Sequence, residues 1–592
     1  MKFSIRISCD IIKIMSYLRD ISEKDILSAT DMNLYDFVKS GTGYDDDDTV
    51  FSYFGKSISF GDFRAEFDRL VRVLASDKEL HKGDRIIISL LTMPESIALL
   101  YACNYVGLVP VMADIRLSPK EMKKIITDTG ASLAFVTDVN AAKLSIVCEA
   151  ECLRKIYVVS VVECFGYPPK FFKKFSSFFT GNRYMFEALG CKKIKGWKDF
   201  TGKQIPKLPE GFTPSDGNSE IIFATSGTTG EKKYVRHAAK TLNRNVYFNE
   251  YFFDFASPEY SSVVTFMPIF VCLGFAGSVH LPLFYGMKLH IHMTYDLRKI
   301  PEIIMQVGPN IFIGSIGYWE RVISSKYAQN GDMSFLRFAL VSGEKCERER
   351  LLEINDFLEK RGSKTKLLPA YGMTELTVIS MVRPGEYNPD SVGKPFPGVN
   401  VSIVEPGTEK ILTPNETGEI CVDSPCMTLG YFGNEEGTKA LIKKHSDGKE
   451  WVHTGDLGYL DKEGYLYIVD RLKNMHVSVS GTKVFLSTID SAVMKCEGVE
   501  SCAAVSVKHD DRRDIKGIIL YVKAKDGRNT GKLRKTVNNI CLTEIPTYLI
   551  PDRVVFLNEM PMTASGKVDK HELEKMAEDI HLNMGISLVT LK

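Results

Sequence analysis

The run Thr225-Ser-Gly-Thr-Thr-Gly-Glu-Lys-Lys233 carries the residue types that bind phosphate groups. Its glycines let main-chain N–H groups approach a phosphate, its hydroxyl groups add donors, and its lysines supply positive charge. The apolar, β-prone residues 221–224 come directly before it and predict a buried strand. A polar surface loop has a similar composition, so both interpretations stay open for this segment alone. The run lacks the Gly-Lys-[Ser/Thr] of a Walker A loop, which argues against the chemistry of P-loop NTPases.

A second segment, Leu368–Glu375, ends an apolar run with an aromatic ring, a hydroxyl group and a carboxylate. Tyr371 can stack on a flat base, and Glu375 can bind a hard cation such as Mg²⁺ through oxygen. The same residues also fit the start of a helix with Thr374 near its N-cap. The segment therefore predicts either a nucleotide and metal site or a helix start.

Two more positions could take part in the same chemistry. Asp456 follows a glycine within Trp451–Gly458, where a carboxylate could accept both hydroxyl groups of a ribose. A Gly-Asp pair is also typical of a β-turn. Lys567 follows Gly566 near the end of the chain, although an isolated lysine is ordinarily a solvated surface charge.

The elements that must position these segments alternate along the chain. Hydrophobic spacing predicts helices over 63–74 and 94–105, and strands over 84–91 and 133–137. Such alternation indicates βαβ units and a largely parallel sheet. Turn-forming and charged residues near 459–473 indicate a domain boundary, and the stretch that follows has the size of a small domain. Strands are expected over 465–469, 502–507 and 518–522.

The composition is that of an ordinary globular chain. Its 592 residues exceed one compact core, with 44% apolar and 25% charged residues. The net charge of +1 gives no electrostatic reason to expect nucleic acid as a partner. Thirteen cysteines without a Cys-x-x-Cys pair argue against a disulfide scaffold and a structural zinc site, and predict buried free thiols.

The N-terminal residues predict no secretory signal, because Cys9, Asp10 and Lys13 interrupt the Ile-rich run. No uncharged apolar stretch reaches the roughly 18 residues that span a bilayer. We therefore expect a cytoplasmic protein. The segment 164–197 interleaves phenylalanines with lysines, which fits an insertion packed on the surface or a weak association with a membrane surface.

Taken in order, these segments resemble the adenylate-forming (AMP-binding) superfamily, which includes acyl-CoA synthetases, aryl-CoA ligases, luciferases and peptide-synthetase adenylation domains. The resemblance runs from about Leu34 to Leu573. Family-like phrases also occur at Ser391–Gly398, Gly418–Val422 and Gly430-Tyr431. The spelling Tyr-Gly-Met-Thr-Glu is more similar to acyl- and aryl-CoA ligases than to peptide-synthetase domains, which more often carry proline where Met373 stands.

The resemblance implies an α/β fold. A large N-terminal AMP-binding domain of layered sheets and helices would cover 31–472 after an extension over 1–30. A small, mobile α+β domain would cover 473–592, with a hinge at Lys473.

The resemblance also implies roles for individual residues. The glycine-rich run and Lys233 would contact the β- and γ-phosphates of ATP, Thr374 the α-phosphate, and Glu375 the Mg²⁺. Lys567 would bridge the bound carboxylate and the α-phosphate, and Gly481 would lie near the pantetheine of coenzyme A. Residues 342–344 with Ala370 and Tyr371 would form the adenine slot, and Asp456 and Arg471 would bind the ribose hydroxyl groups. The ATP-binding residues would be Thr225, Ser226, Gly227, Thr228, Thr229, Gly230, Ser342, Gly343, Glu344, Ala370, Tyr371, Gly372, Asp456 and Arg471.

These residue types suit the family's reaction. A carboxylate attacks the α-phosphorus of ATP and releases pyrophosphate, so catalysis needs positioning, Mg²⁺ and cations rather than a protein nucleophile. A thiol then attacks the acyl adenylate. By resemblance, the small domain rotates about Lys473 between the two steps, which withdraws Lys567.

Several residues depart from the family pattern. Lys232 stands where proline is usual, Tyr234 where glycine is usual, and Val271 where CoA ligases often carry histidine. The stretch before Gly481 is one residue longer than the common pattern, and Thr488 replaces a common acidic residue. These departures bear on the exit of the loop, the acyl pocket and the thioester-forming step.

The expected acyl pocket is apolar. Amino-acid-activating relatives place an aspartate near Phe270 and Val271, but 267–279 contains no acidic residue. A buried, unpaired ammonium group would cost several kcal/mol, on the order of an unmatched charge, which disfavours an α-amino acid. Phe270, Val271 and Met373 would line a pocket for a fatty or aromatic acid. Gly274 and Gly314 would leave room in it for the chain.

Two alternatives remain. The same adenylation step could load the phosphopantetheine of a carrier protein instead of coenzyme A. A non-catalytic acyl- or nucleotide-binding protein could also share the fold. The joint presence of Lys233, Glu375, Asp456 and Lys567 argues against the second alternative.

Overall fold

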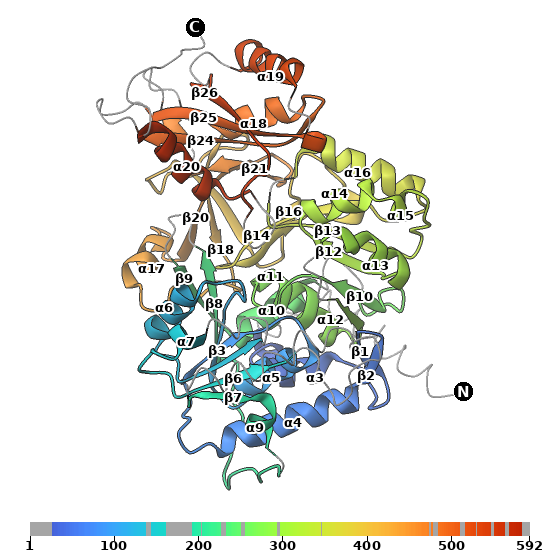
Figure 1. Cartoon of the computed structure of the whole chain (residues 1–592), viewed down its shortest axis with the longest axis vertical. Helices are drawn as coiled ribbons and strands as arrows, with labels where there is room; N and C mark the ends of the chain where they lie inside the picture. The colour runs from blue at the N-terminus through green and yellow to red at the C-terminus, as the bar shows by residue number, and fades with distance from the viewer. Residues whose placement is uncertain are drawn as a thin grey trace. The chain divides into compact units, whose positions relative to one another are not determined.

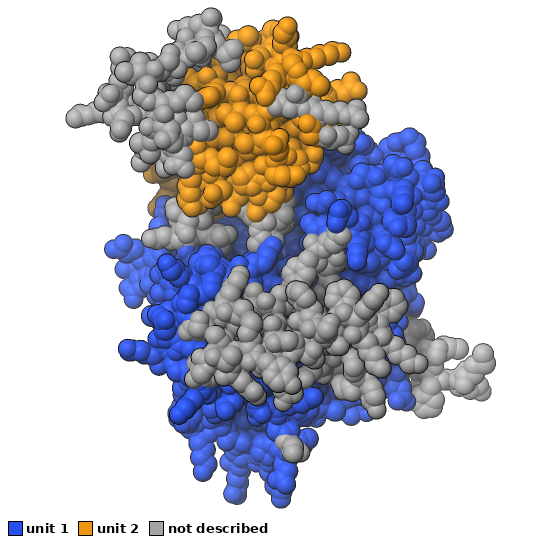
Figure 2. All heavy atoms as spheres, viewed as in Figure 1, with its two compact units in different colours: residues 1–226, 232–401, 422–452 blue, residues 227–231, 402–421, 453–592 orange. Residues whose placement is uncertain are grey.

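The structure is a computed structural model of the whole chain, and its described part leaves several segments out. It describes residues 27–137, 144–160, 192–202, 204–226, 232–249, 255–292, 297–344, 346–472, 475–477, 483–508, 516–527, 530–545, 550–562 and 568–582. Most of the expected extension 1–30 and of the segment 164–197 lies outside these residues. The chain divides into two compact units, of which the first covers 1–226, 232–401 and 422–452 (Figure 2). The second covers 227–231, 402–421 and 453–592, and the expected domain boundaries stay predictions.

A nine-stranded sheet lies in the first unit, in the order β16-β15-β14-β13-β12-β10-β11-β1-β2 (Figure 1). Its strands are β1 (Thr49–Tyr53), β2 (Lys56–Ser59), β10 (Ser262–Thr265), β11 (Lys288–Ile291), β12 (Ile311–Gly314), β13 (Phe338–Val341), β14 (Leu367–Met373), β15 (Thr377–Met381) and β16 (Lys394–Pro395). The pairs from β1 to β14 are parallel, and β2, β15 and β16 pair antiparallel. Helices α13 (Ile300–Val307), α14 (Ile316–Ser324) and α16 (Arg348–Lys360) pack on β10, β12 and β13 through a buried cluster around Phe312 and Trp319.

A seven-stranded sheet, also in the first unit, has the order β7-β6-β5-β3-β4-β8-β9. Its strands are β3 (Arg85–Ser89), β4 (Val109–Met112), β5 (Leu133–Thr137), β6 (Lys155–Val159), β7 (Ile194–Gly196), β8 (Glu220–Ser226) and β9 (Lys232–Ala238). All pairs are parallel except β8 with β9. The strands β3, β4 and β5 are largely buried and apolar, as strands covered on both faces require. The predicted strands over 84–91, 133–137 and 221–224 are confirmed.

The predicted helices over 63–74 and 94–105 are confirmed as α4 (Phe60–Ser76) and α5 (Pro94–Tyr105). α4 begins with a capping box, in which Ser59 accepts from Asp62 N, and it buries one apolar face. α5 begins with Pro94, and nearly all of its residues are buried. The other helices of the first unit are α3 (Leu34–Gly41), α6 (Pro119–Thr129), α7 (Leu144–Val147), α9 (Trp197–Thr201), α10 (Ala239–Phe248), α11 (Cys272–Phe275), α12 (Leu281–Phe284), α15 (Lys326–Gln329) and α17 (Glu435–Leu441).

Two further sheets follow along the chain. A five-stranded sheet has the order β17-β18-β20-β19, with β21 paired to β20. Its strands are β17 (Asn400–Val404), β18 (Gly418–Asp423), β19 (Ile442–Lys444), β20 (Glu450–Leu460) and β21 (Leu466–Arg471). A three-stranded sheet, β24-β25-β26, and the pair β22-β23 lie in the second unit. Their strands are β22 (Met475–Val477), β23 (Lys483–Phe485), β24 (Val499–Lys508), β25 (Lys516–Ala524) and β26 (Arg553–Leu557).

Helices complete the second unit. They are α18 (Ser487–Met494), α19 (Gly531–Thr543) and α20 (Lys570–Leu582). One apolar cluster joins α18, α19 and the strands β24 and β25, with Leu520 and Val537 at its centre. The strands predicted over 465–469, 502–507 and 518–522 are confirmed.

Two general expectations can be compared with the described residues. No helix among them is long and apolar enough to cross a membrane. Nine of their cysteines are free thiols, and seven of these nine are buried. Cys148 is disulfide-bonded, which corrects the expectation of free thiols at that position.

Candidate active site

The predicted phosphate-binding run lies between two antiparallel strands. Thr225 near the end of β8 pairs with Lys233 near the start of β9, and the Thr225 hydroxyl donates to the Lys233 carbonyl oxygen at 3.4 Å. Gly227, Thr228, Thr229 and Gly230 lie outside the described residues, as does the side chain of Ser226. Their roles stay predictions. The hairpin places Lys233 opposite Thr225 on the neighbouring strand.

Lys232 and Tyr234, which depart from the family pattern at the end of this run, both contact helix α6. Lys232 Nζ lies 3.3 Å from Glu121 Oε1, and the Tyr234 hydroxyl donates to Asp128 Oδ2 at 2.6 Å. Burial and the hydrogen bond to Asp128 raise the pKa of Tyr234, so its hydroxyl stays protonated. The start of strand β9 is thus attached to α6 through two side chains at positions where the family commonly has proline and glycine.

Lys233 and Glu375 meet at one hydroxyl group, that of Tyr431. The Tyr431 hydroxyl donates to Glu375 Oε1 at 2.7 Å, and Lys233 Nζ donates to the Tyr431 oxygen at 3.1 Å. The Lys233 ammonium group also lies 4.8 Å from the centroid of the Tyr431 ring. Burial, together with the charge of Glu375, raises the pKa of Tyr431. The sequence had placed Tyr431 only in a family-like phrase and had given it no role.

Thr374 and Glu375 lie in the turn between β14 and β15, where Met373 pairs with Thr377 in an antiparallel hairpin. The alternative of a helix start is therefore wrong. A Cβ atom on Gly372 would lie 2.1 Å from the Thr377 carbonyl oxygen, so this hairpin requires glycine there. Glu375 is buried, and its main-chain oxygen accepts from Thr428 N at 2.8 Å.

The side chain of His237 also contacts the turn that contains Thr374 and Glu375. Its ring is fully buried, with Nε2 2.7 Å from the Thr374 carbonyl oxygen and Nδ1 3.1 Å from the Thr241 hydroxyl. Burial lowers the pKa of His237 to about 4, so the ring is neutral near pH 7. Sequence reasoning missed His237, because a lone histidine in a strand carries no signal of its contacts.

The residues expected around the adenine lie at the ends of neighbouring parallel strands. Ser342, Gly343 and Glu344 follow β13, while Ala370 and Tyr371 belong to β14, and Val341 pairs with Pro369. Gly343 has a φ of 95°, which favours glycine. The carboxyl ends of adjacent parallel strands are where open α/β sheets bind their ligands.

Asp456 and Arg471, the residues expected at the ribose, pair with each other in the second unit. They face one another across β20 and β21, with Arg471 Nε 2.6 Å from Asp456 Oδ1. Asp456 is buried, whereas the Arg471 side chain is 46% exposed. Asp456 lies within a strand, which excludes the β-turn interpretation, and the positive φ of 68° at Gly455 precedes it.

Glu419 supports this strand. Its Oε1 accepts from Gly455 N at 3.2 Å, and its Oε2 lies 3.0 Å from His453 Nδ1. The first contact fixes the main chain just before Asp456, and the second holds the side chain of His453. The carboxylate of Asp456 is therefore held by its strand and by Arg471 together.

Comparison with known protein families gives two matches along the chain. Residues 37–432 match the family of AMP-binding enzymes, and residues 488–567 match the AMP-binding enzyme C-terminal domain. The chain belongs to the AMP-binding enzyme family. The expected resemblance is confirmed.

Relatives of this AMP-binding enzyme cover nearly all of its length. The long-chain-fatty-acid–CoA ligase of Bacillus subtilis (strain 168) is 23% identical over 545 residues, which are 90% of this chain and 93% of the ligase. A feruloyl-CoA synthase of an Amycolatopsis species is 26% identical over 522 residues, 86% of this chain and 93% of the synthase. The ATP-bound RpMatB–BxBclM chimera B3 superposes with a TM-score of 0.76 at 21% identity, covering 93% of this chain and 99% of the chimera. The expected α/β fold with a large N-terminal and a small C-terminal domain is confirmed.

The described contacts bring together only some of the residues that are expected at the acyl pocket of this AMP-binding enzyme. Phe270 is buried, and Val271 and Met373 are partly exposed. The pKa of the neighbouring Cys272 thiol is raised by burial and then by the charge of Glu375, which places this segment near the turn of Glu375.

The two expected pocket glycines do not leave open space. A Cβ atom on Gly274 would lie 2.2 Å from the Pro268 carbonyl oxygen, and one on Gly314 would lie 3.0 Å from Tyr318 Cδ2. These glycines allow close packing within the chain, and their place at an acyl pocket stays a prediction.

Three expected residues, Lys473, Gly481 and Lys567, lie outside the described residues, and their roles stay predictions.

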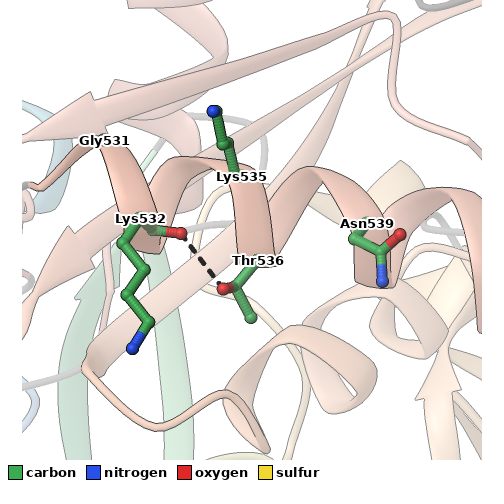
Figure 3. Close-up of a pocket in the computed structure, with 5 residues that line it drawn as sticks. All are labelled: Gly531, Lys532, Lys535, Thr536 and Asn539. Carbon is green, nitrogen blue, oxygen red and sulfur yellow. Dashed lines mark hydrogen bonds between the residues drawn. The ribbon is translucent and has the colours of Figure 1, made fainter.

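A surface hollow on helix α19 is lined by Gly531, Lys532, Lys535, Thr536 and Asn539 (Figure 3). The Thr536 hydroxyl there donates to the Lys532 carbonyl oxygen at 3.0 Å. All five residues belong to one helix, and none of them is an expected site residue.

Glu375 fits the expected magnesium ion by the chemistry of its donor atoms. Its carboxylate is buried, and Tyr431 uses Oε1 alone. In nucleotide enzymes Mg²⁺ is commonly bound by one or two carboxylates together with substrate phosphates. One carboxylate of this kind beside the cationic Lys233 matches that pattern.

Proposed function

We propose that this AMP-binding enzyme uses ATP to activate a carboxylic acid, forming an acyl adenylate, and then transfers the acyl group to coenzyme A. The observation that carries the proposal is the meeting of Lys233 and Glu375 at the Tyr431 hydroxyl. A cation for phosphate groups and a carboxylate for a metal ion are thereby held next to Thr374, the residue assigned to the α-phosphate. Such a grouping suits phosphoryl and adenylyl transfer, in which charge develops on phosphate oxygens.

In the first step, a carboxylate oxygen of the acid attacks the α-phosphorus of ATP. The bond between the α-phosphorus and the bridging oxygen breaks, and pyrophosphate leaves with that electron pair. Lys233 would hold the β- and γ-phosphates, and Thr374 the α-phosphate. Mg²⁺, bound through Glu375, would neutralise charge on the phosphates. Asp456 would accept hydrogen bonds from the ribose hydroxyl groups, with Arg471 keeping its carboxylate in place.

In the second step, the sulfur of coenzyme A attacks the acyl carbon, the acyl–phosphate bond breaks, and AMP leaves while the thiol proton is lost. Lys567 and Gly481 are assigned to the first and second steps by family resemblance. Support for coenzyme A as the acceptor comes from the relatives, a long-chain-fatty-acid–CoA ligase and a feruloyl-CoA synthase. A carrier-protein phosphopantetheine presents the same thiol and is the competing acceptor.

The proposed acid is fatty or aromatic. Residues 267–279 contain no carboxylate to pair with the ammonium group of an amino acid. Phe270 and Val271, which lie in this stretch, are apolar. The two named relatives differ in the acid, one fatty and one aromatic, and so support the class rather than a single substrate.

The test is a screen for pyrophosphate release over fatty, aryl and amino acids, with and without coenzyme A. The proposal predicts release that depends on a fatty or aryl acid and continues to turn over when coenzyme A is present. A purified carrier protein in place of coenzyme A distinguishes the competing acceptor. Absence of acid-dependent release across the screen would contradict the proposal.

Two adjacent lysines provide a matched pair of variants for this screen. Lys233→Met should lower the rate by about 100-fold or more, as removal of a transition-state donor does. Lys232→Met breaks only the ion pair with Glu121 and should stay within about threefold of the native rate. Equal effects would show that Lys233 does not contact the phosphates.

A further inference from the structure

The Tyr431 hydroxyl group forms one hydrogen bond with Glu375 and one with Lys233. It has one proton, which it donates to Glu375 Oε1 at 2.7 Å, and its oxygen accepts from Lys233 Nζ at 3.1 Å. Lys233 keeps two further N–H groups, and Glu375 keeps a second carboxylate oxygen. Both partners can therefore bind other groups while they contact Tyr431.

The main chain around Tyr431 is tied to the segments that carry both partners. Residues 428–432 lie alongside β9, where Arg236 N donates to the Gly430 oxygen at 3.0 Å and Phe432 N donates to the Tyr234 oxygen at 2.8 Å. Thr428 N donates to the Glu375 main-chain oxygen at 2.8 Å. The hydroxyl is thus positioned relative to the strand of Lys233 and to the turn of Glu375 at once.

Tight packing also fixes the backbone just before Tyr431. Gly430 has a φ of 96°, and a Cβ atom on it would lie 2.4 Å from Thr438 Cγ2. Tyr431 N is within 2.9 Å of Thr438 Oγ1. The main chain therefore fixes the direction in which the Tyr431 ring extends, and the ring has little freedom to move together with Lys233 or Glu375.

Without this hydroxyl, Lys233 and Glu375 would be opposite charges separated by the space of one oxygen atom in a partly buried site. Attraction between such charges is stronger there than in water, so a direct ion pair would be expected. That pair would occupy a carboxylate oxygen needed for the metal ion and a charge needed for the phosphates. In the present structure the two groups are joined through Tyr431.

We propose that Tyr431 is a positioning residue that spaces Lys233 from Glu375, so that both groups stay available for ATP with its magnesium ion. Its importance for nucleotide binding rests on the proposed function, whereas the spacing itself does not. The substitution Tyr431→Phe keeps the ring, and with it the contact between ring and ammonium group, but removes both hydrogen bonds. Tyr234→Phe is the matched control, because it also removes a tyrosine hydrogen bond to a carboxylate, that of Asp128.

The experiment measures binding of ATP by calorimetry for the native protein and both variants over a range of Mg²⁺ concentrations. Tyr431→Phe should weaken ATP binding by about tenfold and shift the Mg²⁺ dependence to higher concentration, because a charge-assisted pair now competes. In steady-state assays its KM for ATP should rise more than its kcat falls. Tyr234→Phe should lose a similar amount of thermal stability and bind ATP as the native protein does.

A crystal structure of the Tyr431→Phe variant gives a readout that does not depend on activity. The proposal predicts Lys233 Nζ in direct contact with the Glu375 carboxylate. Lys233 and Glu375 side chains that stay apart in that structure, native ATP affinity of Tyr431→Phe, or equal losses of ATP affinity in Tyr431→Phe and Tyr234→Phe would each overturn it. If the native protein binds no ATP, the proposed function fails, and the crystal structure still decides whether Tyr431 acts as a spacer.

Discussion

His237 Nε2 lies 2.7 Å from the main-chain carbonyl oxygen of Thr374, so a buried ring from strand β9 supports the turn assigned to the α-phosphate. A carbonyl oxygen can only accept, which places the ring proton on Nε2. Nδ1 lies 3.1 Å from the oxygen of the Thr241 hydroxyl, which itself donates to the Ala238 carbonyl oxygen at 2.8 Å. The neutral ring therefore connects helix α10 to the turn of Thr374 and Glu375.

The first prediction concerns this contact. His237→Leu should lower kcat for acid-dependent pyrophosphate release by about tenfold, the value of one hydrogen bond in a buried site. His237→Gln, whose amide can still donate, should recover part of the loss. Comparison of kcat and KM for ATP in both variants checks the prediction. Equal loss in the two variants, matched by equal loss of stability, would show that His237 serves packing alone.

The second prediction concerns the ribose. If Asp456 accepts hydrogen bonds from the ribose hydroxyl groups, Asp456→Asn should raise the KM for ATP by about tenfold, since a charged acceptor is lost. The variant should also discriminate less between ATP and its 2′-deoxy and 3′-deoxy analogues. Asp461→Asn is the control, because Asp461 accepts from Glu463 N and Tyr465 N in a turn of the same hairpin. Unchanged discrimination in Asp456→Asn would move the ribose elsewhere.

The third prediction concerns pH and stability. His280 is fully buried between the Tyr101 hydroxyl at 2.7 Å and Asn243 Oδ1 at 2.9 Å. Asn243 Nδ2 donates to the carbonyl oxygens of Thr30 and Met32, so its Oδ1 accepts from His280 Nε2. Burial lowers the pKa of His280 to about 3. The ring thus remains neutral at a pH where the unfolded chain takes up a proton.

The free energy of unfolding falls with decreasing pH, because the unfolded state takes up a proton on His280 that the folded state does not. The contribution of His280 is complete above about pH 6.5, the ordinary pKa of histidine, and declines as the pH falls toward the folded value. In that window this one ring lowers the free energy of unfolding by up to about 1.4 kcal/mol per pH unit. Urea unfolding of native protein and His280→Gln from pH 7 to pH 4 measures it. The two curves should converge at low pH, and parallel curves would contradict the assignment.

The fourth prediction concerns Lys567, whose role rests on family resemblance. Lys567→Ala should greatly reduce formation of the acyl adenylate but spare thioester formation from a preformed adenylate. Lys575→Ala, an exposed lysine of helix α20, is the control. Separate assays of the two half-reactions check this. Equal loss of both half-reactions would contradict the rotation of the small domain between steps.

Much of the fold could be predicted from local pattern. The strand ending at Ser226 and the helix beginning at Pro94 were both expected, because apolar runs and a helix-starting proline act within one element. The family resemblance placed Asp456 and Arg471 together at the ribose, although it did not predict that they contact each other. In each case the information lies within a few residues or within a shared motif.

The contacts of Tyr431 and His237 could not be predicted in this way. Tyr431 meets a carboxylate 56 positions earlier, and His237 meets a carbonyl oxygen 137 positions later. Such contacts depend on which strands become neighbours, and no local spacing encodes that. The close approach of the Pro268 carbonyl oxygen to Gly274 could not be predicted either, because it depends on the path of the folded main chain.

The central claim is tested most directly by the products formed from ATP. The protein is incubated with ATP, Mg²⁺, coenzyme A and the most active acid from the screen, and all nucleotides and thioesters are quantified. The account predicts AMP, pyrophosphate and acyl-CoA in equal amounts, with none of them formed when the acid is left out. Formation of ADP and phosphate, or of AMP without dependence on the acid, would contradict it.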